Sequence, residues 1–171
     1  AVETAECWQL ALENAGRPSA LALTRQNLPT VRTVHEEANL CGRGAYELAP
    51  ARGDADVTIL ATGSEVEIAL AAKKLIDAAG HSARVVSVPS FELFAEQSGD
   101  YQAEIIGTAP VRVAIEAAIR MGWDRFIGTD GIFIGMKGFG ASAPIDKLYQ
   151  AFGITAEAAA KAALDRLAQR D

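Results

Sequence analysis

The sequence Asp56-Val-Thr-Ile-Leu-Ala-Thr62 is a short apolar run, and Ala83-Arg-Val-Val-Ser-Val88 is a second run of the same kind. Runs of this length that are rich in β-branched residues predict buried strands. Between them, residues 65–79 carry apolar side chains at helical spacing and end before Gly80. A strand, a helix and a strand over about thirty residues form a βαβ unit, so we expect parallel strands joined by a right-handed crossover.

The sequence predicts how the N-terminus of the helix at 65–79 is capped. Ser64 is a favourable N-cap residue, and Glu67 stands three positions later, which is the spacing of a capping box. The turn from Thr62 to Glu65 leads from a strand into a helix N-terminus, where backbone N–H groups can bind an anion. However, the negative charges of Glu65 and Glu67 in the first turn already interact favourably with the helix dipole. The turn also lacks the Gly-x-Gly-x-x-Gly and P-loop patterns of phosphate-binding loops. We therefore expect a structural turn here.

Further elements extend this unit in both directions. Residues 44–49 predict a strand, and the short turn at 50–55 predicts that it pairs with strand 56–62 as an antiparallel hairpin. Downstream, the patterns predict a helical stretch at 91–106, a strand at 111–116, a short edge strand at 125–127, a glycine-rich loop at 130–140, a helix at 144–152 and a final helix capped by Thr155. The result is an α/β fold, a three-layer αβα sandwich in which an antiparallel strand joins an otherwise parallel sheet.

The first part of the chain predicts one helix and one strand. Residues 1–15 place Ala1, Ala5, Trp8, Leu12 and Ala15 on one helical face, and Ser19–Leu23 is an apolar run that predicts a buried strand. Because one helix and one strand cannot close a core, we expect this part to be held only by contacts outside the chain. Limited proteolysis is expected to cut first between Pro29 and Gly44.

Arg25 stands just after the predicted strand, at the end of the strand where ligands bind in open α/β sheets. Its guanidinium group is permanently charged and carries a fork of donors that suits phosphate or carboxylate. The alternative is an arginine that is solvated or paired with a nearby acid. Local sequence alone leaves both interpretations open.

Composition narrows the class of protein. The chain has 171 residues, enough for one full domain with a sizeable core, and half of them are hydrophobic. A net charge of −6 and a pI of about 5.0 argue against general binding to nucleic acid or to anionic membranes. No apolar run approaches the length needed to cross a bilayer.

The cysteines and histidines do not suggest a metal site. Cys7 and Cys41 form neither a close pair in sequence nor a metal-ligand spacing, so we expect ordinary packed thiols in a reducing compartment. His35 and His81 are the only histidines, and both are expected to be solvated. Without a cluster of cysteine and histidine, no zinc site is expected.

Three further places could carry chemistry. Phe139-Gly-Ala-Ser142 suggests a phosphate loop or a serine nucleophile, but it lacks the Gly-x-Ser-x-Gly elbow, and no histidine is placed to act as its base. A tight turn before the next helix is the preferred interpretation. Glu116 and Asp130 could act as acid–base groups, although a buried ion pair or a capping role is the simpler expectation.

Five blocks resemble transketolases and occur in the order in which that family carries them. They are Thr24-Arg-Gln-Asn-Leu28, Thr62-Gly-Ser-Glu-Val66, Val86-Ser-Val-Pro-Ser90, Phe139-Gly-Ala-Ser-Ala-Pro144 and Phe152-Gly153. The resemblance covers nearly the whole chain and implies a last domain with a five-stranded mixed sheet flanked by helices. It further implies that residues 1–28 end a pyrimidine-binding domain, that 29–43 are a linker and that 44–171 are the complete C-terminal domain.

The resemblance also implies a function. Transketolases use thiamine diphosphate and a divalent cation, Mg²⁺ or Ca²⁺, to move a two-carbon ketol unit between sugar phosphates in the pentose phosphate pathway. They work as cytoplasmic homodimers. Arg25 matches the family arginine that holds the phosphate of the sugar substrate, and Thr24 replaces the usual serine beside it.

The family's catalytic, cofactor-binding and metal-binding residues lie upstream of the matched blocks. We therefore assign no catalytic, cofactor-binding or metal-binding residue to this chain. The chain starts at Ala1 without a methionine, so we expect the C-terminal portion of a longer enzyme, inactive when separated from the remainder. No cofactor is expected on this portion alone.

Two alternatives remain. The chain could belong to another thiamine diphosphate enzyme of the same superfamily, such as a dihydroxyacetone synthase or a deoxyxylulose phosphate synthase. It could instead be a noncatalytic C-terminal subunit, or a dimerisation or regulatory module. The blocks at 24–28 and 139–144 favour transketolase.

Overall fold

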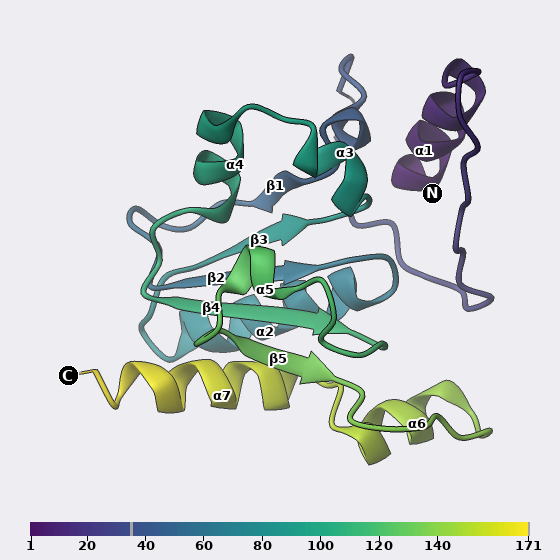
Figure 1. Ribbon diagram of the computed structural model, residues 1–171. Coiled ribbons are helices and arrows are strands. Elements are labelled where there is room, and N and C mark those ends of the chain that lie inside the picture. The colour runs from purple at the N-terminus through teal and green to yellow at the C-terminus, as the bar shows by residue number, and fades with distance from the viewer. Residues whose placement is uncertain (35, 171) are drawn as a thin grey trace.

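The computed structural model describes residues 1–34 and 36–170. In this part of the chain, the strands form a five-stranded sheet in the order β1-β3-β2-β4-β5 (Figure 1). The strands are β1 Tyr46–Ala49, β2 Val57–Ala61, β3 Ala83–Ser87, β4 Val111–Glu116 and β5 Ile132–Gly135. Only β1 runs antiparallel to its neighbour, so the sheet is mixed and mostly parallel, as predicted.

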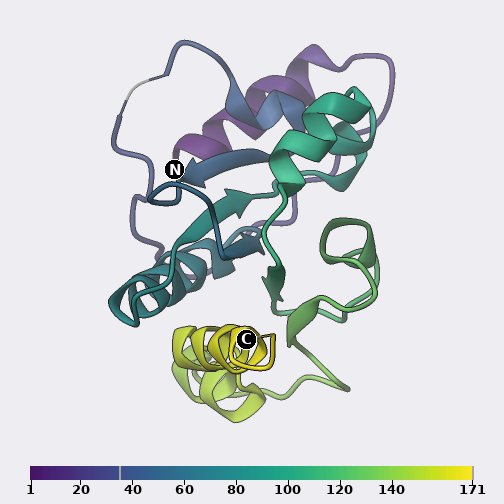
Figure 2. The same cartoon turned by 90° about the vertical axis from the view of Figure 1, so that its left-hand side faces the viewer.

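Helices cover both faces of this sheet. They are α1 Val2–Glu13, the 3₁₀ helix η1 Leu40–Arg43, α2 Glu65–Ala78, α3 Phe91–Ala95, α4 Gly99–Ile106, α5 Asp124–Ile127, α6 Ile145–Phe152 and α7 Ala156–Leu167. α2 and α7 pack on one face, while α3, α4 and α5 pack on the other, which gives the predicted three layers (Figure 2). None of the described helices is long and apolar enough to cross a membrane.

The predicted βαβ unit forms the centre of the fold. β2 is buried along its whole length and pairs in parallel with β3 on one side and with β4 on the other. Because side chains alternate along a strand, Val57, Ile59 and Ala61 face the core shared with α2 and α7. Leu60 faces the second core, under α3, α4 and α5.

β1 does not form the predicted hairpin with β2. It pairs antiparallel with β3 at the edge of the sheet, with Tyr46 opposite Ser87 and Ala49 opposite Val85. Both edges of β2 are taken by β3 and β4, so the edge beyond β3 is the position open to β1. Residues 50–56 can span at most about 23 Å, which exceeds the roughly 10 Å between alternate strands.

The predicted edge strand at 125–127 is a helical turn, α5, and the edge strand is β5, within the segment predicted to be a glycine-rich loop. Trp123, Phe126 and Ile127 are all buried on one side, which three- and four-residue spacing allows only in a helix. The ring centroids of Trp123 and Phe126 lie 5.5 Å apart. The Ile-Phe-Ile run of β5 has the β-branched and aromatic residues that favour a strand.

The start of α2 differs from its prediction. Ser64 has helical backbone angles, φ −65° and ψ −27°, and its side chain caps no N–H group. Its hydroxyl instead donates to the carboxylate of Glu65 at 2.8 Å, so no capping box forms with Glu67. The cap predicted for α7 is confirmed, because Thr155 Oγ1 accepts the N–H of Ala158 at 3.2 Å.

The helical stretch predicted at 91–106 is two helices rather than one. α3 ends at Ala95, and α4 starts afresh at Gly99 with Ser98 as its N-cap. The Ser98 hydroxyl accepts the N–H of Tyr101 at 3.3 Å, which satisfies one donor of the new helix.

The first part of the chain contains the predicted helix but not the predicted strand. Residues 19–23 pair with no other described residue, and all of them except Leu21 are exposed. A strand persists only where a neighbour completes its hydrogen bonds, and the sheet edges lie elsewhere. Between α1 and η1, the described residues form no helix or strand.

α1 docks on the domain within this chain, which contradicts the expectation that only outside contacts hold it. It lies against η1, although the two are almost thirty residues apart in sequence (Figure 2). The docked face carries Glu3, Glu6 and Leu10. The predicted apolar face points outward instead, with Trp8 51% and Leu12 75% exposed.

Candidate functional site

Arg25, the predicted substrate-binding residue, is exposed in the irregular segment that follows α1. Among residues 1–34 and 36–170, its side chain has no hydrogen-bond or ion-pair partner. Thr24 Oγ1 accepts the backbone N–H of Gln26 at 3.1 Å and closes a small turn around Arg25. The structure therefore leaves the guanidinium accessible and brings it together with no other predicted site residue.

A groove of about 1430 Å³ lies between this segment and the carboxyl ends of the central strands. Thr24, Gln26 and Asn27 line one side of it. The turn at 62–67 and Glu116 line the other. β2 is flanked by β3 on one side and by β4 on the other, so the strand order reverses at β2. In open α/β sheets, ligands bind at the carboxyl ends of the strands at such a point.

The turn at the start of α2 is occupied by its own acid. Glu65 is only 4% exposed, and its carboxylate accepts hydrogen bonds from Ser64 and from the Tyr149 hydroxyl on α6. Burial and the contact with Glu65 raise the pKa of Tyr149 to about 12. A buried carboxylate at the start of α2 repels a second anion there, which agrees with the structural turn expected from the sequence.

The two carboxylates suggested as acid–base groups do not meet. Glu116, at the end of β4, accepts the indole N–H of Trp123 at 2.5 Å. Burial raises the pKa of Glu116, and the hydrogen bond from Trp123 lowers it only in part. Asp130 is exposed, and its backbone carbonyl accepts from Arg166 at 2.8 Å. The buried ion pair expected for Glu116 is replaced by the indole.

The remaining sequence candidates lie at the surface. Phe139–Ser142 is exposed and irregular rather than a tight turn, so it offers no nucleophile in a pocket. His81 Nδ1 lies 3.7 Å from the carboxylate of Asp56, and the two can pair when the imidazole is protonated. His35 lies outside the described residues.

A polar cluster that the sequence pattern did not predict joins α1 to the domain. This α1 junction consists of Glu3, Glu6, Arg32, Tyr46 and Ser87. Glu6 accepts two hydrogen bonds of 2.8 Å from Arg32, and Glu3 Oε1 accepts from the hydroxyls of Tyr46 at 2.7 Å and Ser87 at 2.5 Å. The signal in the sequence was two glutamates three positions apart on the helix face opposite the apolar one.

Electrostatics explains the ionised state of the α1 junction. Burial tends to raise the pKa of Glu6, but hydrogen bonds from Arg32 and from the backbone of Cys41 outweigh burial and lower it. The same contact raises the pKa of Arg32. The guanidinium of Arg32 also lies over the ring of Tyr46, 5.2 Å from its centroid. The junction thus holds a buried, charge-assisted contact between the helix and the sheet edge.

The α1 junction also brings the two cysteines together, which their sequence separation did not suggest. Cys41 is buried in η1, and its thiol lies 3.8 Å from the carbonyl oxygen of Glu3. Its backbone N–H donates to Glu6 at 3.2 Å. Cys7 follows Glu6 on α1 and lies one helical turn after Glu3, whose carbonyl the Cys41 thiol reaches, and both cysteines line the groove. Both thiols are free.

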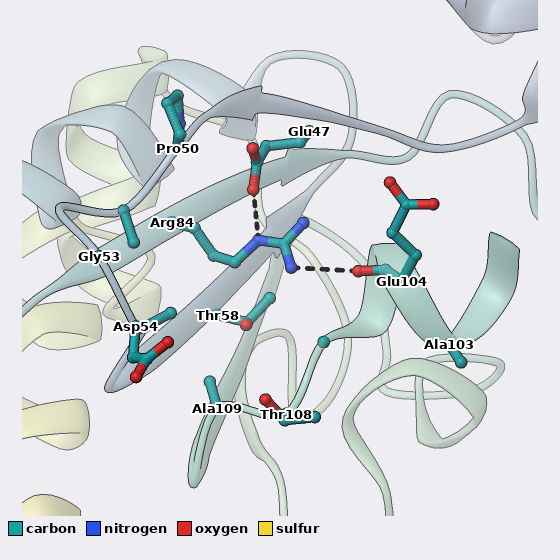
Figure 3. Close-up of a pocket in the computed structure, with 13 residues that line it drawn as sticks. Glu47, Pro50, Gly53, Asp54, Thr58, Arg84, Ala103, Glu104, Thr108 and Ala109 are labelled. Atoms are coloured by element: carbon teal, nitrogen blue, oxygen red, sulfur yellow. Dashed lines mark hydrogen bonds and ion pairs between the residues drawn. The ribbon is translucent and has the colours of Figure 1, made fainter. Parts of the chain in front are cut away.

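A second cavity, of about 380 Å³, lies at the opposite end of the central strands, near the starts of β2, β3 and β4 (Figure 3). Arg84 crosses it, with Nε 2.7 Å from Glu47 and Nη1 donating to the Glu104 carbonyl at 3.2 Å. Arg112 donates to the Gly107 carbonyl at 3.1 Å. These carbonyls end α4, so the arginines satisfy a helix C-terminus, which is a structural role.

No group of three or more histidine, cysteine, aspartate or glutamate side chains within the described residues is placed to hold a metal ion.

The chain is similar in sequence and structure to known proteins of one family. Residues 44–155 match the model of the transketolase-like TK C-terminal domain. A transketolase from Cereibacter sphaeroides is 56% identical over 98% of this chain and 25% of its own length. Among solved structures, the Pichia stipitis transketolase in complex with sedoheptulose-7-phosphate is 32% identical, with a TM-score of 0.87 over 97% of this chain and 24% of that one.

A split-gene transketolase solved as an inactive β4 tetramer shares the fold, with a TM-score of 0.64 and 22% identity over 82% of this chain and 47% of that one. The chain spans about a quarter of the length of the curated relatives that it matches. The family model covers well over half of the chain, and the relatives extend the likeness to its first residues. The chain therefore belongs to the transketolase family, within which its residues 44–155 match the C-terminal domain.

Proposed function

We propose that this chain is the C-terminal part of a transketolase. Such an enzyme uses thiamine diphosphate and a divalent cation to move a two-carbon ketol unit between sugar phosphates in the pentose phosphate pathway, as a cytoplasmic homodimer. The observation that carries the proposal is the match to the Cereibacter sphaeroides transketolase, which is 56% identical. The match covers 98% of this chain but only 25% of the relative's length. In this proposal, residues 1–28 end the pyrimidine-binding domain, 29–43 are the linker and 44–171 are the C-terminal domain.

The described residues do not fit the cofactor. Thiamine diphosphate is held through its phosphates and a cation, and the described part of the chain offers no cluster of ligands for that ion. The groove beside α2 carries Glu65 and Glu116, which would repel a diphosphate. We therefore route no step of the reaction through residues of this chain.

Arg25 is the residue of this chain that we propose to touch substrate. It would bind the sugar phosphate through its guanidinium fork, far from the carbonyl that reacts. Its exposure and its lack of a described acidic partner support this role, because a paired arginine would first have to release its acid. The relative solved with sedoheptulose-7-phosphate shows that a protein of this family accepts a phosphorylated sugar.

The test compares this chain with the longer protein encoded by the reading frame continuous with Ala1. Calorimetry with thiamine diphosphate and Mg²⁺, followed by a coupled assay with a phosphorylated ketose and aldose, is applied to both. We expect cofactor binding and ketol transfer from the longer protein and neither from the 171-residue chain. Turnover by the chain alone, or none by the longer protein, would overturn the proposal.

A second candidate is a noncatalytic C-terminal subunit. The observation that favours it is the likeness of fold to the chain of the split-gene transketolase. A start codon at or near Ala1 and an intact mass that matches the 171-residue chain in the source cells would support it. An open frame that continues upstream would support the first proposal.

A further inference from the structure

The docking of α1 brings together two thiols that stand 34 positions apart in sequence. Cys41 is only 1% exposed and is held from both sides, with its thiol 3.8 Å from the Glu3 carbonyl and its N–H bound to the Glu6 carboxylate. Cys7 lies one residue beyond Glu6 and is half-buried, and within the helix its N–H binds the same Glu3 carbonyl that the Cys41 thiol reaches. The pairing is thus a consequence of the α1 junction.

We propose that Cys7 and Cys41 are a redox modification site, at which a low-molecular-weight disulfide such as oxidised glutathione forms a reversible intramolecular disulfide. This proposal does not depend on the proposed function, because it uses only the two thiols and the contact that aligns them. Cys41 reaches α1 at the Glu3 carbonyl, one helical turn before Cys7, so the two residues lie across the same contact between α1 and η1. A disulfide links Cβ atoms that lie close together, and this contact holds the two backbone segments side by side.

The two thiols have different parts in the reaction. The interaction with the Cys41 thiol lowers the pKa of Cys7, although burial and the charges of Glu3 and Glu6 oppose that effect. Cys7 is also the more accessible of the two. Its thiolate therefore attacks one sulfur of oxidised glutathione, forms a mixed disulfide and releases one glutathione thiolate.

Cys41 then resolves the mixed disulfide. The interaction with the Cys7 thiol, burial and Glu6 raise the pKa of Cys41 in the reduced pair, and the charge of the Cys7 thiolate raises it further. The first step removes that charge. Cys41 loses its proton to solvent, attacks the Cys7 sulfur and releases the second glutathione thiolate, which takes up a proton. In balance, the two cysteines are oxidised, one oxidised glutathione is reduced to two thiols, and one sulfur–sulfur bond forms within the protein.

The consequence is a covalent link between α1 and η1. In the reduced chain, noncovalent contacts alone hold the helix on the domain. In the oxidised chain, α1 cannot leave, and the irregular segment between the two elements becomes a closed loop.

The first experiment identifies the product. The purified chain is incubated with oxidised glutathione and then digested with trypsin without reduction. Cys7 lies in the peptide 1–25, because Pro18 blocks cleavage after Arg17, and Cys41 lies in the peptide 33–43. We expect a chain lighter by two hydrogens in which these peptides are linked, and return to the free thiols on adding dithiothreitol. A chain that stops at the glutathione adduct, forms intermolecular dimers or remains unmodified would overturn the proposal.

Single variants separate the two roles. Cys41→Ser should stop at a glutathione adduct on Cys7, because the resolving thiol is missing. Cys7→Ser should react at least about tenfold more slowly, since the buried Cys41 is then the only target. Equal reaction rates for the two variants would contradict the assigned order of attack.

A second measurement shows that the fold, not chance, joins the thiols. The equilibrium between reduced and disulfide forms is measured against glutathione for the native chain and for the chain in guanidinium chloride. The effective concentration of one thiol at the other should be at least about tenfold higher in the native chain, because unfolding leaves only a flexible loop between them. Equal or lower values in the native chain would show that the α1 junction does not align the pair.

Discussion

Arg32 donates hydrogen bonds of 2.8 Å to both carboxylate oxygens of Glu6, and the two side chains are only 6% and 12% exposed. This bidentate pair joins α1 to the irregular segment that leads from α1 to η1. Breaking a buried pair by removing one partner leaves an uncompensated charge, which costs more than the pair contributes when intact. The docked position of α1 should therefore respond to pH and to substitution at these two residues.

The docking of α1 should weaken in acid. The pKa of Glu6 is lowered in the folded chain, so its contribution to stability is present above the unfolded pKa of about 4.3 and is lost as the pH falls through the folded pKa. Hydrogen exchange of α1, corrected for the intrinsic rate, should show protection at pH 6 that declines below about pH 4. In Glu6→Gln, protection should be lower at pH 6 and should vary little with pH. An identical pH profile in both proteins would contradict this role of Glu6.

Trypsin should cut first after Arg25 rather than in the segment 29–43. Arg25 is exposed without a described partner, whereas Arg32 is held by Glu6, and Arg43 lies in η1 over the ring of Tyr101, 4.7 Å from its centroid. Proteolysis followed by mass spectrometry measures the order of cleavage. Glu6→Ala should accelerate cleavage after Arg32 without changing that after Arg25. First cleavage after Arg32 in the unsubstituted chain would show that the α1 junction opens readily.

Gly44→Ala should destabilise the domain strongly. Gly44 has φ +77°, and an added Cβ would lie 2.1 Å from the backbone nitrogen of Phe94. Strain and overpacking together should cost more than about 3 kcal/mol in urea unfolding. Gly53→Ala is the matched control, because φ is +88° there but the space around the added Cβ is open. Its cost should be about 1–2 kcal/mol. Equal losses in the two variants would rule out the close approach as the cause.

Glu116→Gln should change how stability depends on pH. The pKa of Glu116 is raised in the folded chain, so its contribution is full below the unfolded pKa and is lost as the pH rises through the folded pKa. A glutamine at this position can still accept the indole N–H of Trp123. Thermal unfolding should therefore show the variant gaining stability relative to the unsubstituted chain between pH 4 and pH 8. A difference that does not vary with pH would contradict the raised pKa.

In the longer enzyme, Arg25→Ala should raise KM for phosphorylated sugars more than it lowers kcat, because the phosphate lies away from the reacting carbonyl. A charge-assisted hydrogen bond contributes roughly 1.5–3 kcal/mol, so kcat/KM should fall about ten- to two-hundredfold. Arg25→Lys should recover only part of this loss, since an ammonium group cannot reproduce the bidentate fork. Sugars without phosphate are the control, and equal losses with them would show that Arg25 is structural.

The central βαβ unit could be predicted from the sequence because local patterns determine it. The apolar runs that became β2 and β3, the helix between them and the Thr155 cap all depend on neighbours within a few residues. The family could also be recognised, because short sequence blocks and their order can be read without knowing which residues contact each other in the fold. Arg25 was found in this way, and its role remains a proposal.

Tertiary contacts decided the rest. β1 pairs with β3 rather than with β2 because strand partners depend on which sheet edges remain open, and Trp123 and Phe126 form a helical turn because both rings must reach one core. The docked face of α1 and the meeting of Cys7 with Cys41 follow from hydrogen bonds between residues tens of positions apart. A one-dimensional pattern reports periodicity and spacing, but long-range pairing depends on the competition among distant surfaces, which is settled only when the chain is folded.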